Sequence, residues 1–181
     1  MRIIGGEWRR RVLRFPESEG LRPTPDRVRE TLFNWLGQDL EGLLCLDLFA
    51  GSGALGFEAA SRGAVKVMMV EFAPRVLAAL ESNAKILGAG TRLEIVRADA
   101  VKFATSTGLR FDVLFLDPPY HQGWIERLAP LLPRIAADDA LLYVEAETAL
   151  EGCGDWRTIR HGKAGQVFYH LMQRSGPNGA E

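Results

Sequence analysis

Apolar runs of strand length alternate with segments of helical spacing over most of the chain. In the intervening segments apolar residues recur three and four positions apart, which is typical of amphipathic helices. Strands that alternate with helices predict a parallel sheet covered by helices on both faces. The expected strands are residues 43–49, 65–71, 93–99, 111–117 and 140–147, and the clearest helices between them are residues 74–87 and 123–135.

The pattern changes before and after this alternation. Residues 2–8 and 9–15 predict two short strands around a glycine-containing turn, and residues 156–162 and 166–174 predict a closing antiparallel hairpin. We therefore expect an N-terminal basic β-hairpin arm, one α/β domain and a frayed tail, at residues 1–20, 21–174 and 175–181.

A helix is expected between the N-terminal hairpin and the first core strand. Thr24 suits its N-cap, Pro25 suits its first position, and Gly37 suits its end. The apolar face of this helix combines Val28, Leu32, Trp35 and Leu36. The spacing of these residues predicts that the helix packs on the core.

Composition narrows the class of protein. A chain of 181 residues that is 47% hydrophobic and 25% charged is long enough for one packed domain and too apolar to be disordered. No apolar run reaches the ~20 residues of a membrane span and no secretory signal is visible, so we expect a cytoplasmic protein without a membrane partner. Cys45 lies within an apolar run, which argues against redox chemistry, and the three histidines lack metal-ligand spacing.

Charge is distributed unevenly, although the net charge is only −1. Residues 1–14 contain five arginines and one glutamate, whereas residues 31–181 contain 14 basic and 18 acidic groups. Such a cluster is typical of a segment that binds a polyanion. A solvated basic hairpin without a partner would give the same pattern.

Glycines follow the first core strand, and an acidic residue ends the second. Gly51, Gly53 and Gly56 form a G-x-G-x-x-G sequence, and Glu71 lies twenty residues beyond Gly51. Such glycines permit a close approach of the backbone to a nucleotide, whose ribose hydroxyls the acid can bind. Asp47, just before the glycines, suits a cationic ammonium group better than a diphosphate. The arrangement resembles the first two motifs of S-adenosyl-L-methionine-dependent methyltransferases.

This resemblance implies a Rossmann-like fold with a mostly parallel seven-stranded sheet, here preceded by the hairpin. Asp99 matches the position that binds adenine in this superfamily, although a generic surface aspartate would look the same. The residues expected at S-adenosyl-L-methionine, and at its product S-adenosyl-L-homocysteine, are Asp47, Phe49, Ala50, Gly51, Ser52, Gly53, Glu71, Phe72, Asp99 and Ala100.

The fourth strand is followed by Asp117, Pro118, Pro119 and Tyr120. Adjacent prolines make a rigid corner that donates no backbone hydrogen bond. The sequence resembles the [D/N]-P-P-[Y/F] motif of methyltransferases that modify an exocyclic amino group of a base. It implies that the Asp117 carboxylate and the Pro118 carbonyl accept hydrogen bonds from the amine, while Tyr120 stacks on the extruded base. The motif leaves adenine N6, cytosine N4 and guanine N2 open.

The N-terminal segments distinguish between these bases. Residues 2–16, 20–37, 45–56 and 143–147 resemble the RsmD-type family of bacterial ribosomal RNA guanine-N2 methyltransferases. The resemblance implies methylation of one guanine in 16S rRNA, within the small ribosomal subunit or an assembly intermediate, by an enzyme that we expect to be monomeric. One departure is Arg10, where the family commonly has glycine. The residues expected to contact RNA are Arg2, Arg9, Arg10, Arg11, Arg14, Arg22, Thr24 and Arg27.

Several of the N-terminal residues have two interpretations. Trp8 can stack on a base or pin the hairpin to the domain. Arg22, Thr24 and Arg27 are expected to line the entrance over the cofactor. Arg27 and Arg29 can equally make helix-surface ion pairs with Glu30 or Asp26.

Three other functions compete with this prediction. A DNA adenine-N6 methyltransferase would need a target-recognition segment that so short a chain does not show. An NAD oxidoreductase would use the glycines but would leave residues 117–120 without a role. An RNA-binding assembly factor with a vestigial fold would use the arginines without catalysis.

Overall fold

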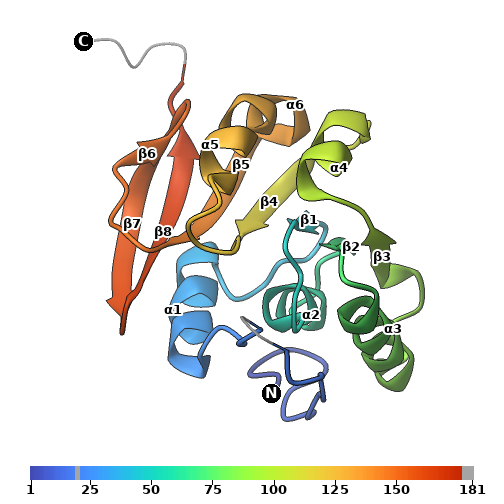
Figure 1. Cartoon of the computed structure of the whole chain (residues 1–181). Helices are drawn as coiled ribbons and strands as arrows, with labels where there is room; N and C mark the ends of the chain where they lie inside the picture. The colour runs from blue at the N-terminus through green and yellow to red at the C-terminus, as the bar shows by residue number, and fades with distance from the viewer. Residues whose placement is uncertain (19–20, 177–181) are drawn as a thin grey trace.

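The computed structural model describes residues 1–18 and 21–176, and an eight-stranded sheet forms its centre (Figure 1). The strands lie in the order β3-β2-β1-β4-β5-β8-β7-β6. β1 to β5 are parallel, whereas β6, β7 and β8 pair antiparallel at one edge. The strands are β1 (Leu44–Asp47), β2 (Lys66–Glu71), β3 (Leu93–Arg97), β4 (Phe111–Leu116), β5 (Ala136–Ala146), β6 (Gly152–Cys153), β7 (Trp156–Ala164) and β8 (Val167–Arg174).

The predicted alternation of strands and helices is confirmed, and β7 and β8 form the predicted closing hairpin. The expected number of seven strands is wrong, because Gly152 and Cys153 pair with Arg157 and Trp156 as an additional edge strand. A strand of two residues has no apolar run of its own and therefore leaves no signal in the sequence. Residues 177–181 of the expected tail lie outside the described residues.

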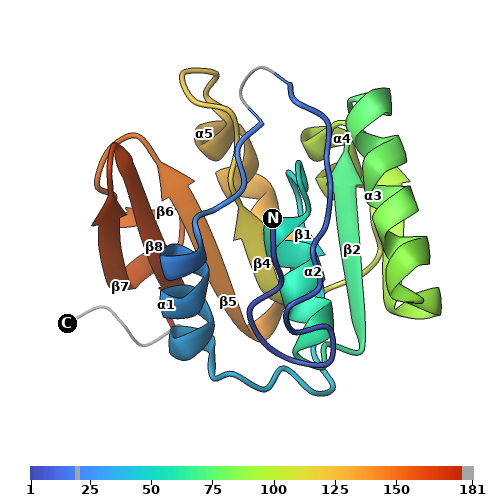
Figure 2. The ribbon, with the colours of Figure 1, turned by 90° about the horizontal axis from the view of Figure 1, so that it is seen from below.

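Helices cover both faces of the sheet (Figure 1, Figure 2). Each face has its own cluster of buried apolar residues. No helix in residues 1–18 and 21–176 is both long and apolar enough to cross a membrane. One face carries α1 (Asp26–Leu36), α2 (Ala54–Ser61) and α3 (Pro74–Leu87), the other carries α4 (Ala100–Ser106), α5 (Trp124–Leu128) and α6 (Leu132–Ile135), and short 3-10 turns lie at η1 (Gly90–Arg92) and η2 (Ala129–Leu131).

The helix α1 ends before Gly37, as its sequence predicts, but its start differs from the prediction. Thr24 is not the N-cap, because Pro25 occupies that position. The Thr24 hydroxyl instead donates a hydrogen bond to the carboxylate of Glu145 on β5, at 3.1 Å. The Thr24 hydroxyl, which the sequence predicts to cap α1, thus binds a residue that is distant in the chain.

The N-terminal segment, residues 1–14, does not form the two strands that its sequence predicts. A single antiparallel bridge joins Arg2 and Val12. The chain turns at Gly6 and Arg10, whose φ angles are 78° and 71°, and it lies along α2 between α1 and α3 (Figure 2). The apolar side chains that it buries in the core of this face are Ile3, Trp8 and Leu13.

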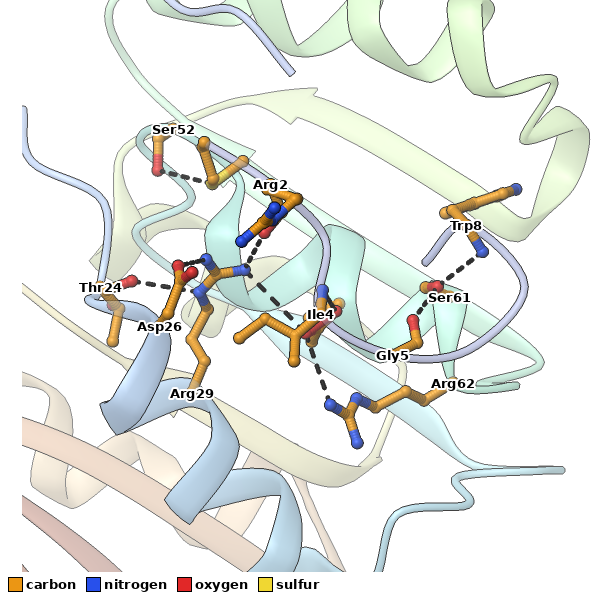
Figure 3. Close-up of polar contacts among 12 residues, drawn as sticks. Arg2, Ile4, Gly5, Trp8, Thr24, Asp26, Arg29, Ser52, Ser61 and Arg62 are labelled. Carbon is orange, nitrogen blue, oxygen red and sulfur yellow. Dashed lines mark hydrogen bonds and ion pairs between the residues drawn. The ribbon is translucent and has the colours of Figure 1, made fainter. Parts of the chain in front are cut away.

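A buried acidic residue of α2, Glu58, fixes this segment, and its partners Ile4, Arg29 and Arg62 are labelled in Figure 3. The Glu58 carboxylate is fully buried and accepts two hydrogen bonds from the backbone N–H of Ile4, at 3.0 and 3.2 Å. The guanidinium groups of Arg62 and Arg29 lie 3.5 and 4.0 Å from the same carboxylate. Cations on both sides offset the cost of burying this charge.

Arg29 lies at the centre of these contacts rather than on the helix surface, where the sequence places it. Its side chain is only 1% exposed. The guanidinium donates to the backbone carbonyls of Thr24 and Arg2, at 3.1 and 3.0 Å, and pairs with Asp26 at 2.6 Å. Arg29 therefore joins the start of α1 to the N-terminal segment (Figure 3).

Candidate active site

The strand order reverses between β1 and β4, which are neighbours in the sheet but not in the chain. β1 leads into α2 on one face, whereas β4 leads into α5 on the other. Connections that diverge in this way leave a crevice beyond the carboxyl ends of the strands, where ligands bind in sheets of this type. The glycine loop after β1 (residues 48–53) and the loop after β4 (residues 117–123) meet at this point.

Two glycines allow α2 to begin directly against the strands. Gly53 is the N-cap of α2, with φ 83°, and a Cβ at this position would lie 2.3 Å from the ring of Phe57. A Cβ at Gly56 would lie 2.9 Å from the Met69 methyl carbon and 3.1 Å from the Asp47 carboxylate. Side chains at these positions would force the helix away from the crevice.

Asp47 is buried at the end of β1, with 2% of its surface exposed. Its Oδ2 accepts a hydrogen bond from the backbone N–H of Gly56 at 3.0 Å. Burial raises the pKa of Asp47 to about 7; the Gly56 hydrogen bond opposes this shift, while the carboxylates of Glu71 and Glu145 add to it. Within residues 1–18 and 21–176, no cation forms an ion pair with Asp47. The site is therefore suited to a positively charged group of a ligand.

Glu71 at the end of β2 holds two loops in place. One carboxylate oxygen accepts a hydrogen bond from the backbone N–H of Gly51 at 2.9 Å. The other accepts from the backbone N–H groups of Phe72 and Ala73, at 3.0 and 3.1 Å. The Phe72 ring beside it is 65% exposed, which is unusual for a large apolar side chain and suits stacking on a planar ligand.

The other residues expected at the cofactor lie along the same edge of the sheet. Ala50 and Ser52 are buried in the glycine loop, and Phe49 packs edge-on against Trp124 with ring centroids 5.3 Å apart. Asp99 caps α4, where its Oδ1 accepts a hydrogen bond from the backbone N–H of Lys102 at 3.1 Å. Asp99 follows β3, at the edge of the sheet, so it lies farther from the loop after β4 than the other acidic residues do. The neighbour of Asp99 at the start of α4, Ala100, is buried.

Asp117 follows β4 directly and contacts a second carboxyl group. Because Leu116 of β4 pairs with Val144 of β5, Asp117 lies beside Glu145, which is within hydrogen-bonding contact. Burial raises the pKa of Asp117 well above its usual range, and Glu145 and Asp47 raise it further. The sequence indicates Asp117 but gives no role to Glu145, since one glutamate in an apolar strand has no periodic signal.

The prolines and Tyr120 complete this corner. Pro118 is buried, whereas Pro119 is exposed. Burial raises the pKa of Tyr120 to about 12, with further contributions from Asp117, Glu145 and Glu147. With such a pKa the Tyr120 phenol stays protonated at neutral pH. The Tyr120 residue is half-buried at the crevice, so part of its ring is accessible. Stacking on a base needs such access.

The arginines expected to contact RNA are all exposed, and Thr24 is not. Thr24 is buried against Glu145, so it lies inside the candidate site rather than on the surface that carries the arginines. Arg11 also donates to the backbone carbonyl of Ile86 on α3 at 3.1 Å. The exposed arginines are Arg2, Arg9, Arg10, Arg11, Arg14, Arg22 and Arg27.

Trp8 pins the N-terminal segment to the domain, which was one of its two predicted roles. Its side chain is 4% exposed, its backbone N–H donates to the Ser61 hydroxyl at 2.9 Å, and the Arg92 guanidinium lies 4.8 Å above its ring. A ring buried in this way cannot stack on a base.

The crevice, the glycine loop and the Asp-Pro-Pro-Tyr corner together define an α/β methyltransferase. Comparisons with known proteins agree with this class. The family described as "Conserved hypothetical protein 95" matches residues 1–173.

Named relatives match over nearly the same range. Ribosomal RNA small subunit methyltransferase D of Escherichia coli strain K12 is 45% identical over 180 residues, covering 96% of this chain and 90% of that protein. Its namesake in Haemophilus influenzae is 42% identical, covering 96% and 93%. The solved structure of yhhF from Escherichia coli superimposes with a TM-score of 0.86 at 45% identity, covering 96% and 97%. The chain therefore belongs to the RsmD family and is a methyltransferase.

Proposed function

We propose that this enzyme transfers a methyl group from S-adenosyl-L-methionine to the exocyclic N2 of one guanine in 16S rRNA, within the small ribosomal subunit or an assembly intermediate. The observation that carries the proposal is the position of Asp117, at the end of β4 beside the glycine loop that follows β1. The names of the relatives support the substrate class.

The charge of the crevice suits this cofactor. Four carboxyl groups converge there, from Asp47, Glu71, Asp117 and Glu145. They attract the ammonium and sulfonium groups of S-adenosyl-L-methionine and repel the diphosphate of NAD. When bound, this cofactor supplies a methyl group that the positive sulfur already activates.

Individual residues fit parts of the cofactor. In this proposal Asp47 binds the ammonium group, Glu71 binds the ribose hydroxyls and Asp99 binds adenine. The exposed ring of Phe72 suits the adenine face. The remaining lining residues in the proposal are Phe49, Ala50, Gly51, Ser52, Gly53 and Ala100.

The corner after β4 addresses the poor nucleophilicity of the amine. The nitrogen lone pair is delocalised into the base, and hydrogen bonds from the two amine protons to the Asp117 carboxylate and the Pro118 carbonyl direct it out of the ring plane. An Asp117 oxygen can then take the proton that the methylated nitrogen loses. Pro118 and Pro119 keep these acceptors fixed, and Tyr120 stacks on the extruded guanine.

The exposed arginines of the N-terminal segment are proposed to bind RNA phosphates. These arginines lie on a packed segment, so RNA binding would have to order only their own side chains and not the backbone. Replacing Arg9, Arg10 and Arg11 with alanine should weaken substrate binding and flatten its dependence on salt. An unchanged salt slope would show that this surface faces solvent in the complex.

The test of the reaction combines one variant with a matched control. Small subunits from a strain that lacks the gene are incubated with labelled cofactor, and the modified nucleotide is mapped. Asp117→Ala should lose nearly all methyl transfer while it still binds S-adenosyl-L-homocysteine in calorimetry. Asp138→Ala, an exposed aspartate on β5, should retain both. Transfer at the normal rate by Asp117→Ala, or binding of NAD in place of S-adenosyl-L-homocysteine, would contradict the proposal.

The proposal includes a monomeric enzyme in the bacterial cytoplasm, where small subunits are assembled. Light scattering of the purified protein tests whether it is a monomer. Co-sedimentation with small-subunit precursors from bacterial lysate tests whether it acts where small subunits are assembled.

A further inference from the structure

The half-buried Asp117 and the buried Glu145 form a carboxyl pair beside the proposed methyl-transfer site. Glu145 is 5% exposed, and its Oε1 accepts hydrogen bonds from the Tyr143 hydroxyl at 2.7 Å and the Thr24 hydroxyl at 3.1 Å. The Glu145 carboxyl group is also within hydrogen-bonding contact of Asp117, whose neighbour Leu116 pairs with Val144 in the sheet. Glu145 is thus held by two hydroxyl groups and touches Asp117.

Two carboxyl groups in such contact cannot both be ionised unless a cation lies between them. In the described part of the chain, neither Asp117 nor Glu145 forms an ion pair with a lysine, arginine or histidine. The titratable groups in electrostatic contact with the pair are Asp47 on β1, Tyr120 after β4 and Tyr143 on β5, and all of them disfavour a second negative charge. Glu71 acts on Asp47, Glu147 on Tyr120 and Tyr169 on Tyr143, so the groups around this cluster add no cation.

We propose that Glu145 is a positioning residue for methyl transfer: it shares one proton with Asp117 and thereby fixes the Asp117 carboxylate in the orientation that accepts the amine hydrogen bond. The proposal deepens the proposed function and rests on it. Glu145 touches no reacting atom, so its effect passes through Asp117. Tyr143 and Thr24 hold the Glu145 carboxyl group in place, because the hydroxyl group of each donates a hydrogen bond to Oε1.

Protons and electrons balance in this scheme. Before reaction the pair holds one proton and one negative charge, and the free Asp117 oxygen accepts a hydrogen bond from the guanine amine. As the new C–N bond forms, the electron pair of the breaking C–S bond goes to sulfur. The methylated nitrogen passes its surplus proton to Asp117, and the pair becomes neutral. That proton leaves to solvent with the product.

The pair explains why a glutamate is tolerated in a strand that is otherwise apolar. Burying an unpartnered carboxylate is costly, and a purely structural position on β5 would favour an apolar side chain. Here the cost is reduced by two hydroxyl donors and the shared proton. Glutamine can reproduce these contacts, since its oxygen accepts from Tyr143 and Thr24 and its NH2 group donates to Asp117.

The experiment compares Glu145→Gln, Glu145→Ala and the control Glu151→Gln, an exposed glutamate in the segment after β5. Single-turnover methyl transfer is measured as a function of pH, and affinity for S-adenosyl-L-homocysteine is measured separately. Glu145→Ala should lose about 100-fold in transfer rate, the order expected when a reacting group is displaced by about 1 Å. Glu145→Gln should recover most of this loss. The affinity of Glu145→Ala for S-adenosyl-L-homocysteine should fall by much less than its transfer rate does.

The pH profile separates positioning from simple packing. In the wild type the rate should fall on the alkaline side, where the shared proton dissociates and the two carboxylates repel. This alkaline fall should disappear in Glu145→Gln, because an amide does not ionise, and should persist in Glu151→Gln. An alkaline fall that persists in Glu145→Gln, or a wild-type rate in Glu145→Ala, would overturn the proposal.

A second measurement keeps this test independent of the reaction. Isotope-edited NMR of the side-chain carboxyl carbons should show that Asp117 titrates at lower pH in Glu145→Gln than in the wild type. If the wild type transferred no methyl group to small subunits, the proposed function would fail, while the NMR titration would still decide whether the proton is shared. An Asp117 titration that is the same in the wild type and in Glu145→Gln would refute the shared proton whatever the substrate.

Discussion

Asp47→Asn should stabilise the cofactor-free protein above neutral pH and weaken cofactor binding. The side chain is 2% exposed, has no cation partner in the described residues, and faces Glu71 and Glu145. A carboxylate in these surroundings is retained at the expense of stability. Asparagine has nearly the same shape and no charge.

The magnitude follows from the pKa of Asp47. It is about 7 in the folded protein, against an ordinary value near 3.9, and at 1.36 kcal/mol per pH unit this corresponds to about 4 kcal/mol. Because the native carboxyl group binds its proton more tightly than the unfolded one, the free energy of unfolding falls as pH rises from about 4 to about 7. Asparagine avoids this fall but leaves its NH2 group poorly paired, at a cost of ~1–3 kcal/mol. The net gain above pH 7 should be about 2 kcal/mol.

Urea unfolding of the wild type and Asp47→Asn, at about pH 5 and about pH 8, measures this effect as a difference between two stability curves. The variant should gain stability relative to the wild type only at the higher pH. Asp112→Asn is the matched control, since the Asp112 carboxylate also accepts a backbone N–H, from Leu44 at 2.9 Å, but is only half-buried. It should lose stability without the gain at high pH.

Calorimetry with S-adenosyl-L-homocysteine supplies the functional half of the prediction. Loss of a hydrogen bond to a charged ammonium group is worth ~1.5–3 kcal/mol, so the dissociation constant should rise about 10- to 100-fold. A stability difference that is the same at both pH values would refute the burial argument. Unchanged affinity would show that Asp47 does not hold the ammonium group.

Two further predictions concern the N-terminal segment. Arg10 has a φ of 71°, which glycine adopts without strain, so Arg10→Gly should raise the free energy of unfolding by about 1 kcal/mol in urea while reducing the salt slope of RNA binding by about 1. Gly6→Ala would place a Cβ 1.9 Å from the Ser61 carbonyl oxygen and should destabilise the protein by about 3 kcal/mol. Gly37→Ala is its control, because Gly37 has a similar φ of 79° but no atom within 4 Å of the added Cβ, and it should lose only about 1 kcal/mol in the same urea assay.

The core of the fold could be predicted from the sequence because its signals are local and repeated. The central parallel strands β1, β2 and β4 are largely apolar, since they are buried on both faces, and each is followed by a helix. The position of the candidate site could be predicted because its residues end these strands or follow them directly in the sequence. Asp47, Glu71 and Asp117 all end such apolar runs, and the carboxyl ends of parallel strands share one edge of the sheet.

The N-terminal segment could not be predicted in the same way, because its partners are distant in the chain. Its apolar and basic residues suggest a hairpin, but Ile4 and Trp8 direct their backbone N–H groups to Glu58 and Ser61 of α2. Arg29 shows the same limit. Spacing alone puts it on a helix surface next to Asp26, whereas it is buried by the segment that crosses above it.

The contacts of Arg29 connect the N-terminal segment, which is proposed to bind RNA, to the proposed acceptor Asp117. The Arg29 guanidinium binds the backbone of Arg2 and of Thr24, the Thr24 hydroxyl binds Glu145, and Glu145 contacts Asp117. Every link in this series is buried except its two ends, and an interior without voids transmits displacement rather than absorbing it. The arginines that are proposed to bind phosphates are thus held at a fixed position relative to the acceptor of the guanine amine. A rigid spacing of this kind favours a target whose phosphates are equally fixed, as in a folded ribosomal particle, over a flexible strand that would first have to be ordered.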